Sequence, residues 1–207
     1  MPKPRVKARV KAEAWYPVYA PPAFGEVELP AVVSDDPSKL IGSGVEATLY
    51  DITGDYSHIN IKLRFQIVRV EGGKAYTEFK GEEYLGDYLR SLVRRGSSKV
   101  DSIFDVETRD GYKLRIFLLC CTAKRISRSQ AKAIRSIGRR IMVEKASTLN
   151  FTQFVQEAVL SKLASDVYNE AKKIAPLRHV GIRKIKVLTK LVEKAEEVEA
   201  VAEAQNS

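Results

Sequence analysis

The chain has 207 residues, of which 44% are hydrophobic and 29% charged, and its 35 Lys and Arg against 26 Asp and Glu give a formal net charge of +9. A chain of this length and composition can bury a core without disulfides or metal, and its positive charge predicts a polyanionic partner. No apolar run approaches the roughly 18 residues of a membrane span, and no apolar segment follows the basic N-terminus. We therefore expect a cytoplasmic protein without a membrane partner.

We expect residues 1–14 to form an arm, in which basic residues alternate with Pro, Val and Ala from Lys3 to Ala12. In an extended backbone every second side chain points to the same face, about 6.6 Å from the next, so the charges would line one side. Because the arm has little to bury, we expect it to be disordered alone and to become ordered on an anionic surface. Its predicted RNA-binding residues are Lys3, Arg5, Lys7, Arg9 and Lys11.

The segment after the arm is rich in proline, which disfavours a helix and favours an extended path. Trp15 and Tyr16 lie in this segment. They can stack on an unpaired base, but we favour a plug that packs against the domain. Residues 34–44 are predicted to form a loop. From His58 to Val68 hydrophobic and polar residues alternate, which predicts a strand with one buried face and one wet face.

Two glycine turn signals, Gly72-Gly73 and Asp110-Gly111, favour tight hairpins in the middle of the chain. The elements predicted around them are a strand over 74–80, a helix over 82–94, and strands over 100–108 and 112–122. The last of these strands is apolar on both faces, so we expect it to be covered on both. It contains Cys120 and Cys121, which we expect to be inert core thiols in a reducing compartment.

The pattern then becomes helical. Ser127 or Ser129 can cap a helix that runs to about Lys145, and a second helical stretch covers residues 152–174 with a break near Ala164.

A final strand with a phase slip is predicted over residues 180–188. Strands followed by helices and a last strand indicate an α+β fold with a compact β-barrel-like core and flanking helices. We expect residues 15–190 to form this single domain and residues 191–207 to form a Glu-rich acidic tail.

Basic residues cluster in the second half of the chain. From Lys113 to Lys145 the only acid is Glu144, and from Lys172 to Lys190 there is none. Helices that serve solubility normally mix Glu with Lys, so we favour phosphate contact over a merely solvated face. Four bases of the predicted helix fall at i, i+4, i+7 and i+11, on one stripe with an average spacing of about 5.5 Å. The predicted RNA-binding residues of this half are Lys124, Arg125, Arg128, Lys132, Arg135, Arg139, Arg140, Arg183, Lys184 and Lys186.

Catalytic residues are not grouped in the sequence. His58 and His179 have no cysteine or carboxylate at metal-ligand spacing, and we expect both to contact RNA or solvent. The segment Gly42-Ser43-Gly44 lacks the Lys and Ser/Thr that end a phosphate-binding loop. The sequence therefore predicts no enzyme activity, no metal and no cofactor.

Three stretches resemble one protein family. They are Trp15-Tyr16-x-Val18-x-Ala20-Pro21-x-x-Phe24, the segment from Phe104 to Arg125 with its Thr108-x-Asp110-Gly111-Tyr112 turn, and Pro176–Leu188 with Ile182-Arg183-Lys184-Ile185-Lys186. Their order and spacing resemble those of the archaeal and eukaryotic small-subunit ribosomal proteins called S3Ae, also written eS1, and the short arm is similar to that of archaeal members. The resemblance implies a β-barrel core docked on the subunit platform, near the 3′ end of the RNA and the messenger exit, without enzymatic activity. The tail from Glu193 has no counterpart, and its role is open.

We therefore expect a structural constituent of the small ribosomal subunit that supports translation. Its partners would be small-subunit ribosomal RNA and neighbouring small-subunit proteins, with messenger RNA as a further candidate. The main alternative is a free RNA-binding or RNA-chaperone module. An RNA-processing nuclease, which would need converging carboxylates or a histidine pair, and a protein–protein adaptor are weaker alternatives.

Overall fold

The computed structural model describes residues 14–189, which form an α+β structure of eight strands and five α-helices. The predicted arm residues Lys3, Arg5, Lys7, Arg9 and Lys11 and the acidic tail 191–207 lie outside the described residues. In chain order the strands and α-helices are β1 (Ala14–Tyr19), β2 (Glu28–Ser34), β3 (Gly44–Thr48), α1 (Leu49–Thr53), β4 (Ile61–Glu71), β5 (Lys74–Tyr84), α2 (Gly86–Leu92), β6 (Lys99–Glu107), β7 (Lys113–Thr122), α3 (Arg128–Thr148), α4 (Phe151–Val159), α5 (Lys162–Ala171) and β8 (Leu177–Val187). Short 3-10 turns η1 (Pro22–Phe24), η2 (Pro37–Lys39) and η3 (Tyr56–His58) lie between the first strands.

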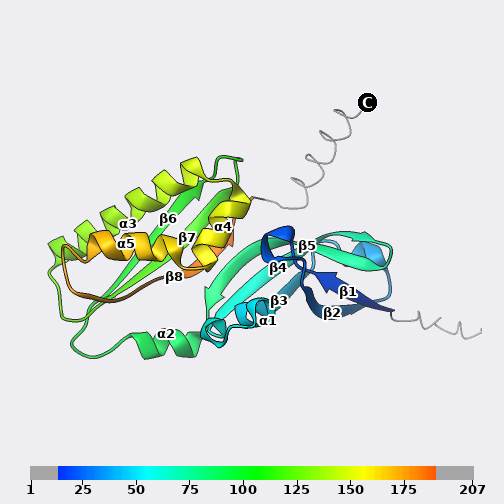
Figure 1. Ribbon diagram of the computed structural model, residues 1–207, viewed down its shortest axis with the longest axis horizontal. Coiled ribbons are helices and arrows are strands. Elements are labelled where there is room, and N and C mark those ends of the chain that lie inside the picture. The colour runs from blue at the N-terminus through cyan, green and yellow to red at the C-terminus, as the bar shows by residue number, and fades with distance from the viewer. Residues whose placement is uncertain (1–13, 190–207) are drawn as a thin grey trace, which may run out of the picture.

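The eight strands form one open, mixed sheet (Figure 1). Its main path runs β2-β1-β5-β8-β7-β6, and a second branch adds β4 beside β5 and β3 beside β4. Only β1 and β5 run parallel, and the other paired strands are antiparallel. Within residues 14–189 no ladder joins β2 to β3. The predicted β-barrel-like core is therefore wrong, because the sheet does not close.

Strand β5 explains why the sheet branches. One of its edges pairs with β4 along the whole strand, whereas the other edge pairs with β1 at Ala75 and Tyr76 and with β8 from Gly81 to Glu83. Register shifts in the β4–β5 ladder bend the strand between these partners. Where β5 crosses β8, a Cβ atom on Gly81 would overlap the carbonyl oxygen of Ile185. Glycine at this position lets the two backbones approach closely.

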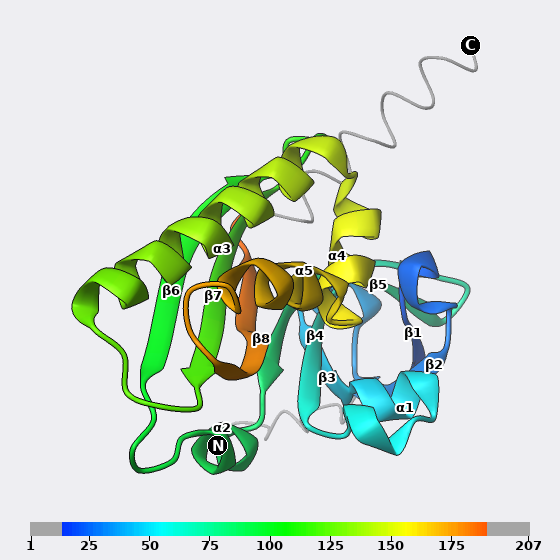
Figure 2. The ribbon, with the colours of Figure 1, turned by 60° about the vertical axis from the view of Figure 1, so that its left-hand side comes forward.

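Helices α3 and α5 cover one face of β6, β7 and β8 (Figure 2). The cap of α3 is the predicted Ser127, whose side chain accepts a hydrogen bond from the Gln130 N–H while the Gln130 side chain accepts one from the Ser127 N–H. Ile134 and Ile141, which are seven positions apart on α3, are both buried. A Cβ atom on Gly138 would overlap the side chain of Leu118 in β7, so α3 lies very close to the sheet at this point.

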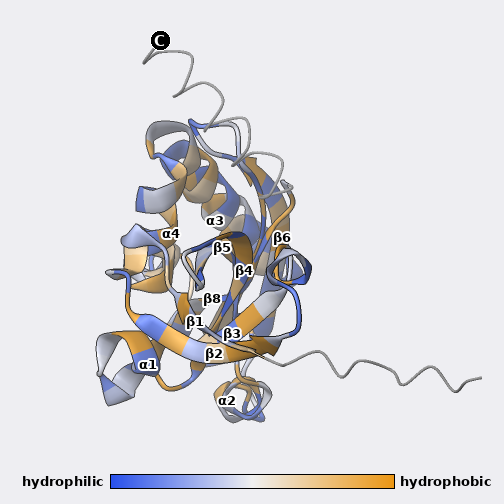
Figure 3. Ribbon diagram, turned by 90° about the vertical axis from the view of Figure 1, so that its right-hand side faces the viewer, coloured by the Kyte–Doolittle hydropathy of each residue, from blue (hydrophilic) through white to orange (hydrophobic). Residues whose placement is uncertain are grey.

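One hydrophobic core extends through both halves of the molecule. Hydrophobic and hydrophilic residues alternate along the strands (Figure 3), and the apolar residues of β4 from Ile61 to Ile67 are all buried, which confirms the predicted alternation. Strand β7 is buried on both faces from Leu118 to Thr122. Burial raises the pKa of the Cys120 thiol to about 12 and also raises the pKa of Cys121, so both are protonated core residues, as predicted.

Two predicted elements around β4 and β5 have different bounds. The strand predicted from His58 begins at Ile61, and His58 lies in the turn η3. The helix predicted over 82–94 is only Gly86–Leu92. Residues 82–84 stay in β5 because their backbones pair with β4 and, in part, with β8.

Predictions in the second half of the chain agree better with the structure. Gly111 adopts φ +76° in the β6–β7 turn, where the hairpin was predicted. The break in the second helical stretch falls at Ser161, which has φ +60°, close to the predicted Ala164. The phase slip of the last strand is a bulge at Arg183 in the β7–β8 ladder.

The predicted aromatic plug is confirmed for only one of its two residues. Tyr16 is half-buried and packs against the core, whereas the Trp15 side chain is 72% exposed. Successive side chains of a strand point to opposite faces, so only one of these neighbours in β1 can face the core. The plug prediction is wrong for Trp15.

Candidate nucleic-acid interface

Exposed cations follow one side of α3. Arg128, Lys132, Arg135 and Arg139 are all exposed, and their spacing places them on one stripe of the helix. The buried positions of α3 lie on a different side, so the packing that holds the helix leaves this stripe outside. Lys124 and Arg125, which are also exposed, lie in the turn that precedes the Ser127 cap.

Two of the predicted arginines on α3 make contacts inside the fold. The Arg135 Nε donates a hydrogen bond of 2.9 Å to the carbonyl oxygen of Asp101 in β6, the edge strand, and thereby covers an edge carbonyl. Arg140 lies off the stripe and forms an ion pair with Glu170 of α5, and its Nε lies 4.0 Å from Glu144. Both arginines therefore hold α3 against its neighbours.

The remaining cations of this side have no such contacts. We call this set the α3 surface, and its members are Lys124, Arg125, Arg128, Lys132 and Arg139. Within residues 14–189 none of the five forms an ion pair. Neighbouring positive charges of this set have no carboxylate between them and repel one another, so an external anion would stabilise them.

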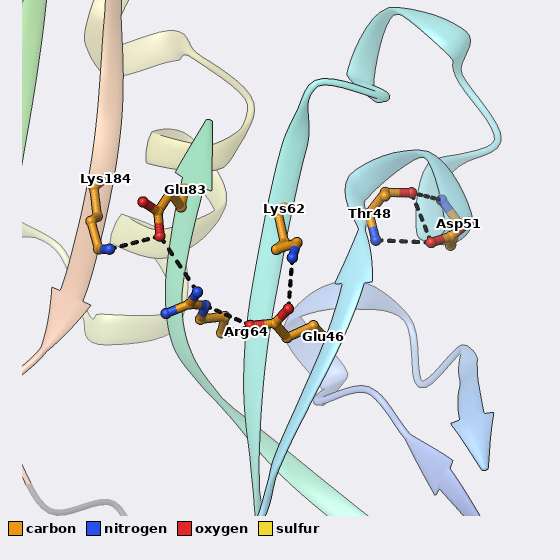
Figure 4. A network of polar contacts seen from close by, with 7 residues as sticks. All are labelled: Glu46, Thr48, Asp51, Lys62, Arg64, Glu83 and Lys184. Carbon is orange, nitrogen blue, oxygen red and sulfur yellow. Dashed lines mark hydrogen bonds and ion pairs between the residues drawn. The ribbon is translucent and has the colours of Figure 1, made fainter. Parts of the chain in front are cut away.

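Three cations on the strands are paired instead. The cross-strand network, shown in Figure 4, consists of Glu46 of β3, Lys62 and Arg64 of β4, Glu83 of β5 and Lys184 of β8. Glu46 lies 2.7 Å from the Lys62 Nζ and 2.9 Å from the Arg64 Nε, and the Lys62 hydrogen bond in particular lowers the pKa of this carboxyl group. Glu83 lies 2.6 Å from the Lys184 Nζ and 3.6 Å from Arg64. Lys184, predicted to bind RNA, is thus the cation of an internal ion pair, with its side chain only 19% exposed.

The other two predicted cations of β8 have different surroundings. Arg183 lies at the bulge with its guanidinium 5.5 Å from the centre of the Phe117 ring, a cation–π contact. Lys186 is exposed and forms no ion pair within the described part of the chain. The structure also leaves Lys173 and Arg178 exposed near the start of β8, again without ion pairs to residues 14–189. Sequence reasoning did not select them, although the acid-free run from Lys172 was the available signal.

Neither histidine resembles a catalytic or metal-binding group. The Nδ1 of His58 lies 3.1 Å from the Thr53 hydroxyl. His179 is half-buried against the rings of Tyr84 and Tyr88, not in solvent as expected, and burial lowers its pKa. In the described range 14–189, no group of three or more His, Cys, Asp or Glu could hold a metal ion. No helix in that range is long and apolar enough to cross a membrane.

The structure is thus an open α+β scaffold that exposes a row of cations without ion-pair partners among residues 14–189. The Ribosomal S3Ae family model matches residues 2–190. The chain belongs to this family, and it is accordingly a structural ribosomal protein rather than an enzyme.

Individual relatives agree over almost the whole chain. The chain is 49% identical over 202 residues to the small ribosomal subunit protein eS1 of Archaeoglobus fulgidus, covering 97% of this chain and 95% of the relative. It is 47% identical over 183 residues to the proteins of the same name from Desulfurococcus amylolyticus and Saccharolobus solfataricus. These alignments cover 88% of this chain and 86% and 88% of the two relatives.

Proposed function

We propose that this protein binds small-subunit ribosomal RNA in cytoplasmic ribosomes, chiefly through phosphate contacts of the α3 surface. Arg183, Lys186 and the arm residues from Lys3 to Lys11 would extend the contact. From the family resemblance we further propose a position on the subunit platform near the messenger exit, beside other small-subunit proteins and within reach of messenger RNA.

The observation that carries this proposal is that the cations of the α3 surface have no ion-pair partner within residues 14–189. The capping box and the buried isoleucines hold the backbone of α3 in place, so the positions from which the cations project are fixed, and no carboxylate of residues 14–189 forms an ion pair with the five. A cation that neutralises a phosphate releases condensed counterions, which makes binding favourable and strongly salt-dependent. Side chains already paired inside the fold contribute little of this free energy.

The salt dependence of RNA binding tests the proposal. The triple variant Arg128→Glu, Lys132→Glu and Arg139→Glu should weaken binding to a small-subunit RNA fragment and reduce the slope of log K against log salt by about two to three. The matched control reverses Arg94, Arg95 and Lys162, three exposed cations elsewhere that form no ion pair within residues 14–189, and it changes the net charge equally. Circular dichroism should show both variants folded. An equal loss in the control would mean that net charge, not the α3 surface, drives binding.

Sedimentation distinguishes an integral ribosomal protein from a free RNA-binding module. On a sucrose gradient in high-salt buffer, we expect the wild-type protein to migrate with small subunits and the triple variant to be depleted from them. Recovery of the wild type at the top of the gradient would favour the free module.

A further inference from the structure

A cleft of about 760 Å³ opens where four distant segments of the chain meet. Its walls come from residues 20–26 around η1, residues 68–79 of the β4–β5 hairpin, residues 110–112 of the β6–β7 turn and residues 151–155 at the start of α4. The turn and the helix are fastened together, because the Phe151 N–H donates a 2.9 Å hydrogen bond to the Asp110 carboxylate. A cleft of this volume can enclose a large side chain together with its backbone.

Aromatic rings form much of one wall. Tyr112 and Phe151 stack with ring centres 4.3 Å apart and 18° between their planes, and Phe79 lies 6.4 Å from Phe151. Tyr76 also lines the cleft and already carries a guanidinium, because Arg69 lies 5.0 Å from the centre of its ring. The faces of aromatic rings carry partial negative charge and attract cations.

A carboxylate without a counter-charge lies beside these rings. The Glu78 Oε2 is buried and has no hydrogen-bond partner among the described residues. Burial raises the pKa of Glu78, and burial together with the nearby Glu78 charge raises the pKa of Tyr112 to about 12. A second acid, Glu26, lines the same cleft. A cationic residue, Arg69, also lines the cleft, with its guanidinium over the Tyr76 ring and one of its nitrogens 3.6 Å from Glu71.

We propose that this cleft binds an arginine side chain from an extended segment of a neighbouring protein, with the guanidinium on the Tyr112–Phe151 wall and hydrogen-bonded to Glu78. Charge complementarity favours this occupant: the rings and the two glutamates attract a cation and repel an RNA phosphate. The position of the cleft also separates it from the proposed RNA-binding surface. It lies at the C-terminal end of α3, a helix of 21 residues and thus about 30 Å long, whereas the α3 surface begins at the opposite end. RNA binding by the α3 surface does not depend on what the cleft binds.

The test follows the Glu78 carboxyl by NMR in the full-length protein labelled with 13C-glutamate. The probe is the peptide acetyl-Gly-Arg-Gly-amide, and its neutral control contains citrulline in place of arginine. A guanidinium beside the carboxylate stabilises its charged form, so the arginine peptide should lower the pKa of Glu78 by about one unit or more. The citrulline peptide should leave the pKa unchanged.

Two variants and a nucleotide ligand test whether the response depends on Glu78 and on arginine. Glu78→Gln should abolish the peptide-induced shifts of the Tyr76 and Tyr112 rings, while Glu107→Gln, at an exposed position on β6, should preserve them. Equal shifts with citrulline, or shifts that survive Glu78→Gln, would overturn the proposal. So would a Glu78 response to cytidine monophosphate instead of the peptide. A rise in the pKa of Glu78 after deletion of residues 2–12 would assign the cleft to the chain's own arm and also overturn it.

Discussion

The α3 surface and the cross-strand network contain the same kinds of cation in opposite electrostatic situations. In the α3 surface none of the five cations forms an ion pair within residues 14–189, while on the strands Lys62, Arg64 and Lys184 each lie within ion-pair distance of Glu46 or Glu83. A positive residue in this protein is therefore not evidence of a binding surface by itself. What distinguishes the two regions is whether the fold supplies a counter-charge.

The two situations arise from the geometry of the elements. Side-chain neighbours on a helix come from the same short segment, so an acid-free segment gives an uncompensated surface. Neighbours on a sheet come from other strands, and the network joins residues as far apart as Glu46 and Lys184 through the β3–β4–β5–β8 ladders. A strand cation can thus be neutralised by a glutamate more than a hundred positions away.

Separating β5 from β8 should have the largest effect, because it removes the ladder that places Glu83 opposite Lys184. In Gly81→Ala the new Cβ atom would overlap the Ile185 carbonyl oxygen, and neither backbone can move without breaking the ladder. We expect a loss of about 5 kcal/mol in the free energy of unfolding, comparable with the whole stability of many domains. Urea denaturation measures it. Gly86→Ala, whose Cβ atom meets open space, is the control, and a Gly81→Ala midpoint close to that of the control would show that β5 and β8 are not tightly joined.

Glu82, the neighbour of Glu83 on the opposite face of β5, extends the comparison to a carboxyl group that has no cation. It is fully buried, and desolvation raises its pKa from 4.5 to about 8. Because the folded state binds this proton more tightly than the unfolded state, the contribution of Glu82 to stability should be most favourable below pH 4.5 and become less favourable as the pH rises to about 8. Glu82→Gln should remove most of this trend and be more stable than wild type by roughly 4 kcal/mol near pH 8, but by less than about 1 kcal/mol near pH 5.

Urea midpoints of wild type and variant at the two pH values check this prediction. Glu83→Gln is the control, since it disrupts the network without removing the buried acid. The same pH trend in Glu82→Gln as in wild type would assign the trend to other groups.

Sequence reasoning succeeded where the deciding interactions are local. The Ser127 cap involves residues three positions apart, the Asp110-Gly111 turn joins adjacent strands, and the burial of β4 follows from strict alternation. The α3 stripe belongs to the same class, because helical periodicity alone places its members on one side. These features were predictable since each depends on a few neighbouring residues.

It failed where distant strands determine the result. The barrel prediction did not anticipate that β5 changes partner from β1 to β8, a pairing between residues 81–83 and 184–186. The same ladder accounts for the shorter helix after β5. The pairing of Lys184 with Glu83 was not anticipated because it has no local signal, and the aromatic cleft around Glu78 was missed because its walls come from four separate segments.

Two single substitutions, one in each region, are expected to have the smallest effects, and together they test the comparison directly. Lys184→Met leaves Glu83 without its closest counter-charge in a partly buried site and should cost about 1–2 kcal/mol of stability, while the salt slope of RNA binding stays unchanged. Arg139→Met should behave in the opposite way, with stability within about 0.5 kcal/mol of wild type and a slope reduced by about 0.7 to 1. Methionine retains a long apolar side chain, so each change removes mainly the charge. Urea midpoints and RNA titrations on the same two proteins place each cation in one class or the other. If Lys184→Met reduced the slope as much as Arg139→Met does, internal pairing would not prevent a strand cation from binding RNA, and the distinction between the two regions would be lost.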